Sequence, residues 1–304
     1  MIKKIIVIFL ITISIFIIYA IVGNPEWEIN NEKLESQVQI SDEIISIDKN
    51  QESNEPKKIP TDLVSEFFDV WVYENDIFIE NGVKVAKSFH FELIEENNDL
   101  YNEIGIINDG VSVVVILPVF TSSAYSENGF YDYYENKCDS CTTTKIVEND
   151  FLEYYTASQI GAKILERLGY ETITDIVVDK NPDILKEFDS VILLHNEYVT
   201  QTMFDAITEH PNVIYLYPNA LYAEINVNYD TNQITLIRGH GYPSSDIENG
   251  FNWEYENTDP YEFDRDCLNW EFYDIPNGKM LNCYPEKIFP LNKEFLKEIK
   301  NLVN

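Results

Sequence analysis

Reactive side chains gather where the buried strands predicted for this chain end. His195, Asn196 and Glu197 follow the strand predicted at 190–194, and His240 stands between two glycines after a later strand. An imidazole beside a carboxylate is the arrangement that general acid–base catalysis or metal-assisted hydrolysis requires. In a hydrolase, Glu197 would act as base or metal ligand, with His195 or His240 as its partner.

Polar side chains also follow other predicted strands. In an open α/β sheet, ligands bind beyond the carboxyl ends of the parallel strands, so residues at these places are candidates for contact with a ligand. Here they follow the strands predicted at 111–117, 190–194 and 213–217, and we expect the hairpin that ends at 238 to reach the same rim. The candidate ligand-binding residues are Thr121, Ser122, Ser123, Tyr125, Asn196, Asn219, Tyr222 and Arg238.

Each of these residues also has a purely structural interpretation. Asn and Glu after a strand commonly cap the next helix, and His195 could simply bond to a neighbouring loop. The tyrosine-rich segment at 125–134 is long for an α/β connection, which is typical of a binding lid, but its rings could instead cover the edge of the sheet.

No nucleophile elbow, metal-binding motif or phosphate-binding loop occurs in the sequence. This absence favours a domain that binds a small molecule, a glycan or a protein without catalysis. The alternative is an amidase-type hydrolase at the carboxyl edge of the sheet, for which a divalent metal is a compatible cofactor. The residues identify neither the metal nor the ligand.

The charge of the chain narrows the choice of partner. The 304 residues include 53 acidic and 21 basic side chains, which give a net charge of −32. Such an excess of negative charge argues against nucleic acid as a partner. Cationic or neutral partners fit better.

The elements that position the candidate residues alternate between strand and helix. A nearly continuous β-branched run at 111–117 predicts a strand buried on both faces, and further strands are predicted at 172–178, 190–194 and 213–217. Three helices are predicted between these strands. The first is capped by Asp150, runs through Leu168 and ends at Gly169. The second is short and begins at Asn181-Pro182, and the third is capped by Thr200 and runs through His210. This order predicts an α/β core at 111–243, with a mostly parallel, flavodoxin-like sheet and flanking helices.

Different patterns lie on either side of that core. Residues 61–110 alternate between polar and apolar positions at 69–73 and 88–93, with a turn signal at 81–82, so we expect a β-rich lead-in. The segment at 223–238 reads as a hairpin, and 244–290 as a long irregular stretch. Asn292 is expected to cap a final helix at 293–303. Residues 61–304 would thus form one folded unit.

The amino-terminal part predicts attachment to a membrane. Two lysines precede an uncharged run at 5–23, close to the roughly 20 residues that span a bilayer. A cleavable signal peptide is the alternative, but its apolar region is usually about 7–15 residues and ends in a recognisable cleavage site. We expect residues 1–23 to be an uncleaved signal anchor, 24–60 a disordered acidic tether, and the rest to be extracytoplasmic.

Four cysteines in an exported domain predict two disulfides. Three pairings are formally open; the one expected joins Cys138 to Cys141 and Cys267 to Cys283, because each pair lies within one irregular segment. Cys138-Asp139-Ser140-Cys141 could alternatively be a thioredoxin-like redox pair or half of a zinc site. Three threonines follow it where a redox motif would begin a helix, and no second closely spaced pair is present.

The order of these elements resembles the class I glutamine-amidotransferase-like fold and the related domain of N,N-dimethylformamidase large subunits. The resemblance spans roughly residues 110–240 and rests on the strand and helix pattern. Amidotransferases carry a cysteine on a Gly-x-Cys-x-Gly elbow, whereas Tyr217-Pro218-Asn219-Ala220-Leu221 follows the last parallel strand here. Glutaminase chemistry is therefore not expected. The dimethylformamidase resemblance implies metal-assisted hydrolysis with tyrosine and glutamate ligands, which Glu197 and nearby tyrosines could supply.

Overall fold

The computed structural model describes residues 56–80, 83–147, 158–253, 264 and 266–304. The predicted membrane anchor, most of the predicted tether, the turn signal at 81–82 and the helix cap at Asp150 lie outside these residues. In the part of the chain that is described, no helix combines the length and the apolar character needed to cross a lipid bilayer.

A six-stranded sheet lies at the centre of the fold. Its strands, in spatial order, are β14 (Phe272–Ile275), β15 (Gly278–Leu281), β11 (Val213–Tyr215), β9 (Ser190–Leu193), β6 (Val113–Leu117) and β8 (Glu171–Thr174). Every neighbouring pair is parallel except the edge pair of β14 and β15. Counted along the chain, the five parallel strands lie in the order 2-1-3-4-5. The predicted α/β architecture, with parallel strands and flanking helices, is confirmed.

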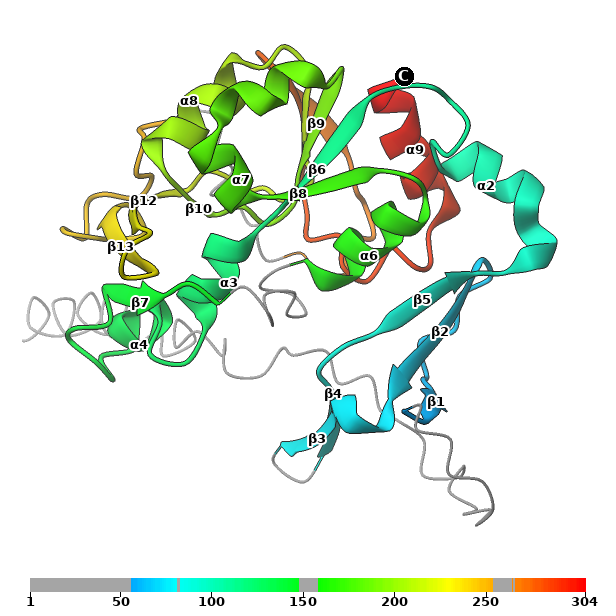
Figure 1. The fold of residues 1–304 in the computed structure, drawn as a ribbon, viewed down its shortest axis with the longest axis horizontal. Coiled ribbons are helices and arrows are strands. Elements are labelled where there is room, and N and C mark those ends of the chain that lie inside the picture. Colours follow the sequence, from blue (N-terminus) through cyan, green and yellow to red (C-terminus); the bar gives the residue numbers. More distant parts are fainter. Residues whose placement is uncertain (1–55, 81–82, 148–157, 254–263, 265) are drawn as a thin grey trace, which may run out of the picture. The chain divides into compact units, whose positions relative to one another are not determined.

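Helices bury both faces of this sheet (Figure 1). Val113 and Val115 of β6 pack in one apolar cluster, and Val114 and Ile116 pack in another, because successive side chains of a strand point to opposite faces. The first cluster includes α2 (Asn98–Ile104), α6 (Gln159–Arg167) and α9 (Lys293–Val303). The second includes α3 (Val119–Tyr125), α4 (Phe130–Tyr134), α7 (Asp175–Lys180) and α8 (Gln201–Glu209). This double burial explains the unbroken apolar run of β6.

Side-chain caps begin two of the helices as predicted. The Thr200 hydroxyl accepts a hydrogen bond from the Met203 backbone N–H at 3.2 Å, at the start of α8. Asn292 accepts one from the Phe295 N–H at 3.0 Å, at the start of α9. A cap of this kind contributes about 1 kcal/mol by satisfying a backbone donor that the helix leaves unpaired.

The strand predicted at 172–178 is shorter than the sequence suggested. Residues 172–178 were expected to be extended, but β8 ends at Thr174 and α7 begins at Asp175. The Asp175 carboxylate is fully buried and accepts a hydrogen bond from the Phe120 N–H of α3 at 2.8 Å. This contact between distant segments outweighs the strand preference of the β-branched residues that follow. Short 3₁₀ helices at Glu74–Asp76, Glu95–Asn97 and Pro182–Glu187 complete the helical elements described, the last of them at the predicted Asn-Pro position.

The lead-in segment forms two small antiparallel sheets. One has the order β1-β2-β5, from β1 (Lys58–Pro60), β2 (Phe68–Tyr73) and β5 (His90–Leu93), and the other pairs β3 (Ile77–Glu80) with β4 (Val83–Ala86). The prediction that the disordered tether extends to residue 60 is therefore wrong, because Lys58–Pro60 pairs with β2. Lys163 and Arg167 of α6 donate hydrogen bonds to the carbonyl oxygens of Phe89 and Phe91, which ties this segment to the core.

A four-stranded sheet, β10-β12-β13-β7, lies next to the carboxyl ends of the central strands. Its members are β7 (Thr143–Lys145), β10 (Tyr198–Val199), β12 (Ala223–Asn228) and β13 (Gln233–Arg238). The predicted hairpin of β12 and β13 is confirmed. Since β10 begins directly after Glu197 and pairs with the start of β12, this sheet fixes the backbone around the candidate site.

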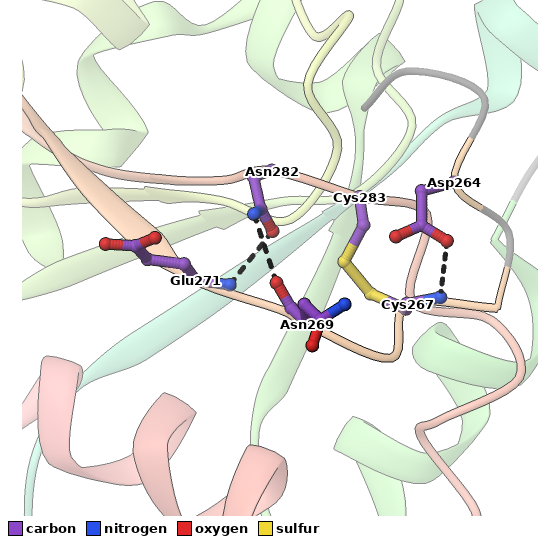
Figure 2. The surroundings of a disulfide bond; sticks show 6 residues. All are labelled: Asp264, Cys267, Asn269, Glu271, Asn282 and Cys283. Carbon is purple, nitrogen blue, oxygen red and sulfur yellow. Dashed lines mark hydrogen bonds between the residues drawn. A yellow bond between two sulfur atoms is a disulfide. The ribbon is translucent and has the colours of Figure 1, made fainter. Parts of the chain in front are cut away.

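The segment after the hairpin is only partly irregular. Residues 272–281 form the β14–β15 hairpin, and β15 extends the central sheet by pairing in parallel with β11. Figure 2 shows the disulfide between Cys267 and Cys283 that closes this region, with Asp264 accepting a hydrogen bond from the Cys267 N–H at 2.9 Å. The other disulfide joins Cys138 to Cys141. Both predicted pairings are confirmed.

Candidate functional site

Glu197 is the centre of the candidate site. Its side chain is 1% exposed, and its backbone carbonyl accepts hydrogen bonds from the N–H groups of Tyr222 and Ala223, each at 2.9 Å. One carboxylate oxygen, Oε2, accepts a hydrogen bond from the Tyr125 hydroxyl at 2.9 Å and lies 3.5 Å from His195 Nε2. The other, Oε1, lies 3.7 Å from His240 Nε2. Burying a carboxylate is costly unless hydrogen bonds compensate it, and the Tyr125 hydroxyl donates one here.

Two phenols extend the cluster from the connection after β6. Tyr125 ends α3 and Tyr131 lies on α4, with their rings stacked at a centroid distance of 3.9 Å. The Tyr131 hydroxyl donates to the Tyr125 hydroxyl at 2.5 Å and lies 3.2 Å from His240 Nε2. Burial, and then the charge of Glu197, raises the pKa of Tyr125 well above its usual value. Both effects keep this phenol protonated and able to donate to the carboxylate.

His240 is held by an unusual backbone and by aromatic rings. It has a positive φ of 55° between two glycines that also have positive φ, and its N–H donates to the Glu248 carbonyl at 2.7 Å. The imidazole stacks on Tyr134 at 4.5 Å and meets Tyr131 and Tyr222 edge-on. Burial lowers the pKa of His240 to about 4, so the imidazole is uncharged at neutral pH.

His195 lies near the Glu197 oxygen Oε2, whereas His240 lies near Oε1. Its Nε2 is 3.0 Å from Asn219 Nδ2, and its ring stacks on Tyr217 at 4.9 Å. Its backbone N–H donates to the Ser158 hydroxyl at 2.9 Å. These contacts hold the imidazole beside Glu197 with only 4% of its side chain exposed.

A second buried carboxylate supports this side of the site. Glu286 accepts a hydrogen bond from the Tyr217 hydroxyl at 2.5 Å and another from the Ile160 N–H at 3.0 Å, at the first turn of α6. Burial raises the pKa of Glu286 to about 7, against the opposing effect of these hydrogen bonds. Glu286 therefore fixes Tyr217, and through the stacked ring it fixes His195.

The other predicted ligand-binding residues divide into two groups. Asn219 contacts His195, and Tyr222 contacts His240. Asn196, which lies between His195 and Glu197 in the sequence, is fully buried. The rest hold local structure or are simply buried. Thr121 accepts from the Tyr198 N–H, Ser123 bonds to the backbone of Val119 and Val147, Ser122 is buried on α3, and Arg238 donates to Gly250 and Asn252.

The sequence did not single out three residues of the site. Tyr131 and Tyr134 belonged to the predicted lid but not to the candidate set, although a lid that crosses the strand ends was the signal available. Glu286 lies in a segment read as irregular, and its role depends on contacts with α6 and Tyr217 that no local pattern shows.

The atoms of this site that could coordinate a metal ion are mainly oxygens. Among the residues described, no three His, Cys, Asp or Glu side chains are grouped so as to hold a metal ion. Phenols add to that set, since the oxygens of Tyr125, Tyr131 and Glu197 follow one another at 2.5 and 2.9 Å. Hard divalent cations prefer oxygen ligands, so these three oxygens form a chemically suitable donor set.

Comparison with known proteins adds no family: no protein-family model and no curated protein matches the sequence.

Proposed function

We propose that this protein is an amidase-type hydrolase whose site is centred on Glu197. The observation that carries the proposal is the burial of this carboxylate in contact with Tyr125, His195 and His240. Buried ionisable groups that face one another at the carboxyl ends of strands are typical of active sites. A surface ion pair or a helix cap does not account for this arrangement, because no helix starts at Glu197 and its side chain is almost completely enclosed.

The position of the site supports the proposal. β6 and β9 are neighbours in the sheet, yet the chain leaves them toward opposite edges, to β8 on one side and to β11 on the other. Doubly wound folds with the strand order 2-1-3-4-5 bind ligands at this switch point. Tyr125 follows β6 and Glu197 follows β9, and these positions support a ligand site at the switch point. The order is in keeping with a flavodoxin-like or amidotransferase-like fold, which we propose for this core.

Glu197, Tyr125 and Tyr131 would hold a divalent metal ion through their oxygen atoms. Such an ion would polarise the carbonyl of an amide and lower the pKa of water at the site. The two phenols are protonated in the present structure and share their protons along the chain to Glu197. Binding of the ion must therefore release protons, which a titration in weak buffer would detect.

The two imidazoles would have different roles in hydrolysis: His240 would transfer a proton, and His195 would position Glu197. His240 is uncharged and about 30% exposed, and in the tautomer with its proton on Nδ1 its Nε2 would take a proton from the attacking water while the new C–O bond forms. The same proton then passes to the amide nitrogen as the C–N bond breaks, giving a carboxylic acid and an amine. His195, held between Tyr217 and Asn219, keeps the Glu197 carboxylate in place.

Replacing Glu197 tests this function directly. The Glu197→Gln variant keeps the size of the side chain but loses its charge, and we expect it to lose amide hydrolysis and bound metal while its circular dichroism and unfolding midpoint stay close to those of the parent. Glu209→Gln, at the exposed end of α8, is the matched control. Normal turnover in Glu197→Gln would exclude the role proposed here, and lost turnover with normal metal content would make Glu197 the base instead of a ligand.

A ligand-binding domain without catalysis is the second candidate. It is favoured by the enclosure of His240 between Tyr131, Tyr134 and Tyr222, which leaves aromatic faces and a buried negative charge suited to a neutral or cationic small molecule. Binding of small amides without any product over long incubation would support it over the hydrolase.

We also propose that the chain is anchored in a membrane through residues 5–23, with the rest outside the cytoplasm. The uncharged run and the preceding lysines support this, as do the two disulfides, which form in oxidising compartments. Protease added to intact cells should digest the folded part; protection of that part until the cells are lysed would contradict the proposed topology.

A further inference from the structure

Asn219, which contacts His195, has a buried carbonyl oxygen without a hydrogen-bond partner among the described residues. The residue follows β11 and is only 3% exposed, and its amino group, Nδ2, lies 3.0 Å from His195 Nε2. Its Oδ1 is buried and has no hydrogen-bond partner within the described residues. In this orientation the amino group faces the imidazole, so the carbonyl oxygen is the atom left to accept a hydrogen bond from something else.

A neighbouring asparagine has the same property. Asn196 is fully buried, and neither its Oδ1 nor its Nδ2 has a partner in the part of the chain that is described. Its backbone carbonyl accepts a hydrogen bond from the Leu221 N–H at 2.9 Å, which brings the chain after β9 against the chain after β11. Buried amides without partners are rare in folded proteins, and two in adjoining segments next to an active-site candidate indicate a place that a polar ligand completes.

The chemistry of the free oxygen defines what the ligand must supply. A carbonyl oxygen accepts hydrogen bonds and cannot donate them, so it needs an N–H or O–H group on the ligand. Each phenol already gives its single proton within the cluster, Tyr131 to Tyr125 and Tyr125 to Glu197, so neither supplies a donor to the ligand. Under the proposed function the ligand is an amide, and an amide that gives an N–H to Asn219 has at least one hydrogen on nitrogen.

We propose that Asn219 selects primary and secondary amides over tertiary amides by accepting a hydrogen bond from the substrate N–H. This inference rests on the proposed hydrolase function and names the substrate class of the same site. A tertiary amide leaves the Asn219 oxygen buried and unpaired when bound. Loss of one buried hydrogen bond of this kind weakens binding roughly 5- to 150-fold.

The test uses acetamide, N-methylacetamide and N,N-dimethylacetamide with the whole chain. All three give acetate, so one assay measures turnover, and ligand-observed NMR measures binding without relying on catalysis. We expect acetamide to bind at least about 5-fold more tightly than the dimethyl compound and to have the higher kcat/KM, in line with the cost of an unpaired acceptor.

Variants of Asn219 isolate the oxygen from other causes. Asn219→Leu keeps the approximate volume but removes the acceptor, and the preference should disappear mainly through weaker binding of acetamide. Asn219→Asp retains acceptor oxygens and should keep the preference. Asn226→Leu, on an exposed position of β12, is the control and should behave as the parent does.

Loss of the hydrolase function and loss of the Asn219 recognition give different experimental results. Tight and selective binding of acetamide without acetate release would remove the hydrolase function and leave the recognition by Asn219 standing. Turnover of all three amides at similar kcat/KM would remove the recognition and leave the hydrolase. Equal binding of the three amides, no binding of any of them, or an unchanged preference in Asn219→Leu would each overturn the inference.

Discussion

Glu286 makes the stability of the fold depend on pH in a way that can be calculated. The carboxyl group is fully buried between Tyr217 and the first turn of α6, and burial raises its pKa from 4.5 to about 7. Because the folded state binds this proton more tightly than the unfolded state does, Glu286 stabilises the fold most when it is protonated. The stability that it contributes is present below about pH 4.5 and is lost as the pH rises through about 7.

The size of this effect follows from the shift. A shift of about 2.5 pH units corresponds to about 3 kcal/mol, of which roughly 2.5 kcal/mol falls between about pH 5 and pH 8. Glu286→Gln removes the titration while keeping an oxygen that can accept the Tyr217 proton. We therefore expect the free energy of unfolding of the parent, minus that of the variant, to fall by roughly 2.5 kcal/mol over this range.

Urea unfolding at several pH values, monitored by circular dichroism at constant ionic strength, measures this difference. Taking the difference between two proteins cancels the titration of their other carboxylates. The control is Glu166→Gln, at an exposed position of α6. Its difference from the parent should not change with pH. A flat difference for Glu286→Gln, or one that rises with pH, would refute the buried and protonated state assigned to this group.

Two further predictions concern the packing and capping of helices. Gly161→Ala should destabilise the fold by about 1–2 kcal/mol in denaturant unfolding, because the new methyl group would lie 2.5 Å from the buried Phe289 ring, and only part of that cost is offset by the helix preference of Ala. Asn292→Ala should cost about 1 kcal/mol, because it removes the acceptor for the Phe295 N–H at the start of α9; an unchanged unfolding midpoint would show that the cap contributes nothing.

The core of the fold was predictable because its pattern is strong. The unbroken apolar run of β6 and the capped helices α8 and α9 are local signals, and each of them appears in the structure. Asp175 shows where such signals fail. Its segment has the composition of a strand, but the carboxylate bonds to Phe120 from another part of the chain, and this contact turns the segment into a helix.

Short strands that depend on a partner were also missed. Lys58–Pro60 and the β14–β15 hairpin carry no strong pattern of their own, and they become strands because β2 and β11 offer them an edge. The sequence predicted those site residues that follow predicted strands. The structure brings four of them together: His195, Glu197, Tyr125 and His240. The contact of Glu286 with Tyr217 depends on tertiary packing and could not be predicted in this way.

The central claim is that Glu197 makes this site a hydrolase. The most direct measurement is acetate release from acetamide by the metal-supplemented chain, compared between the parent and Glu197→Gln at equal folded concentration. We expect a rate at least about 100-fold lower in the variant, because a metal ligand or general base is lost. Equal rates in the two proteins, or no acetate from the parent with any divalent metal supplied, would contradict it.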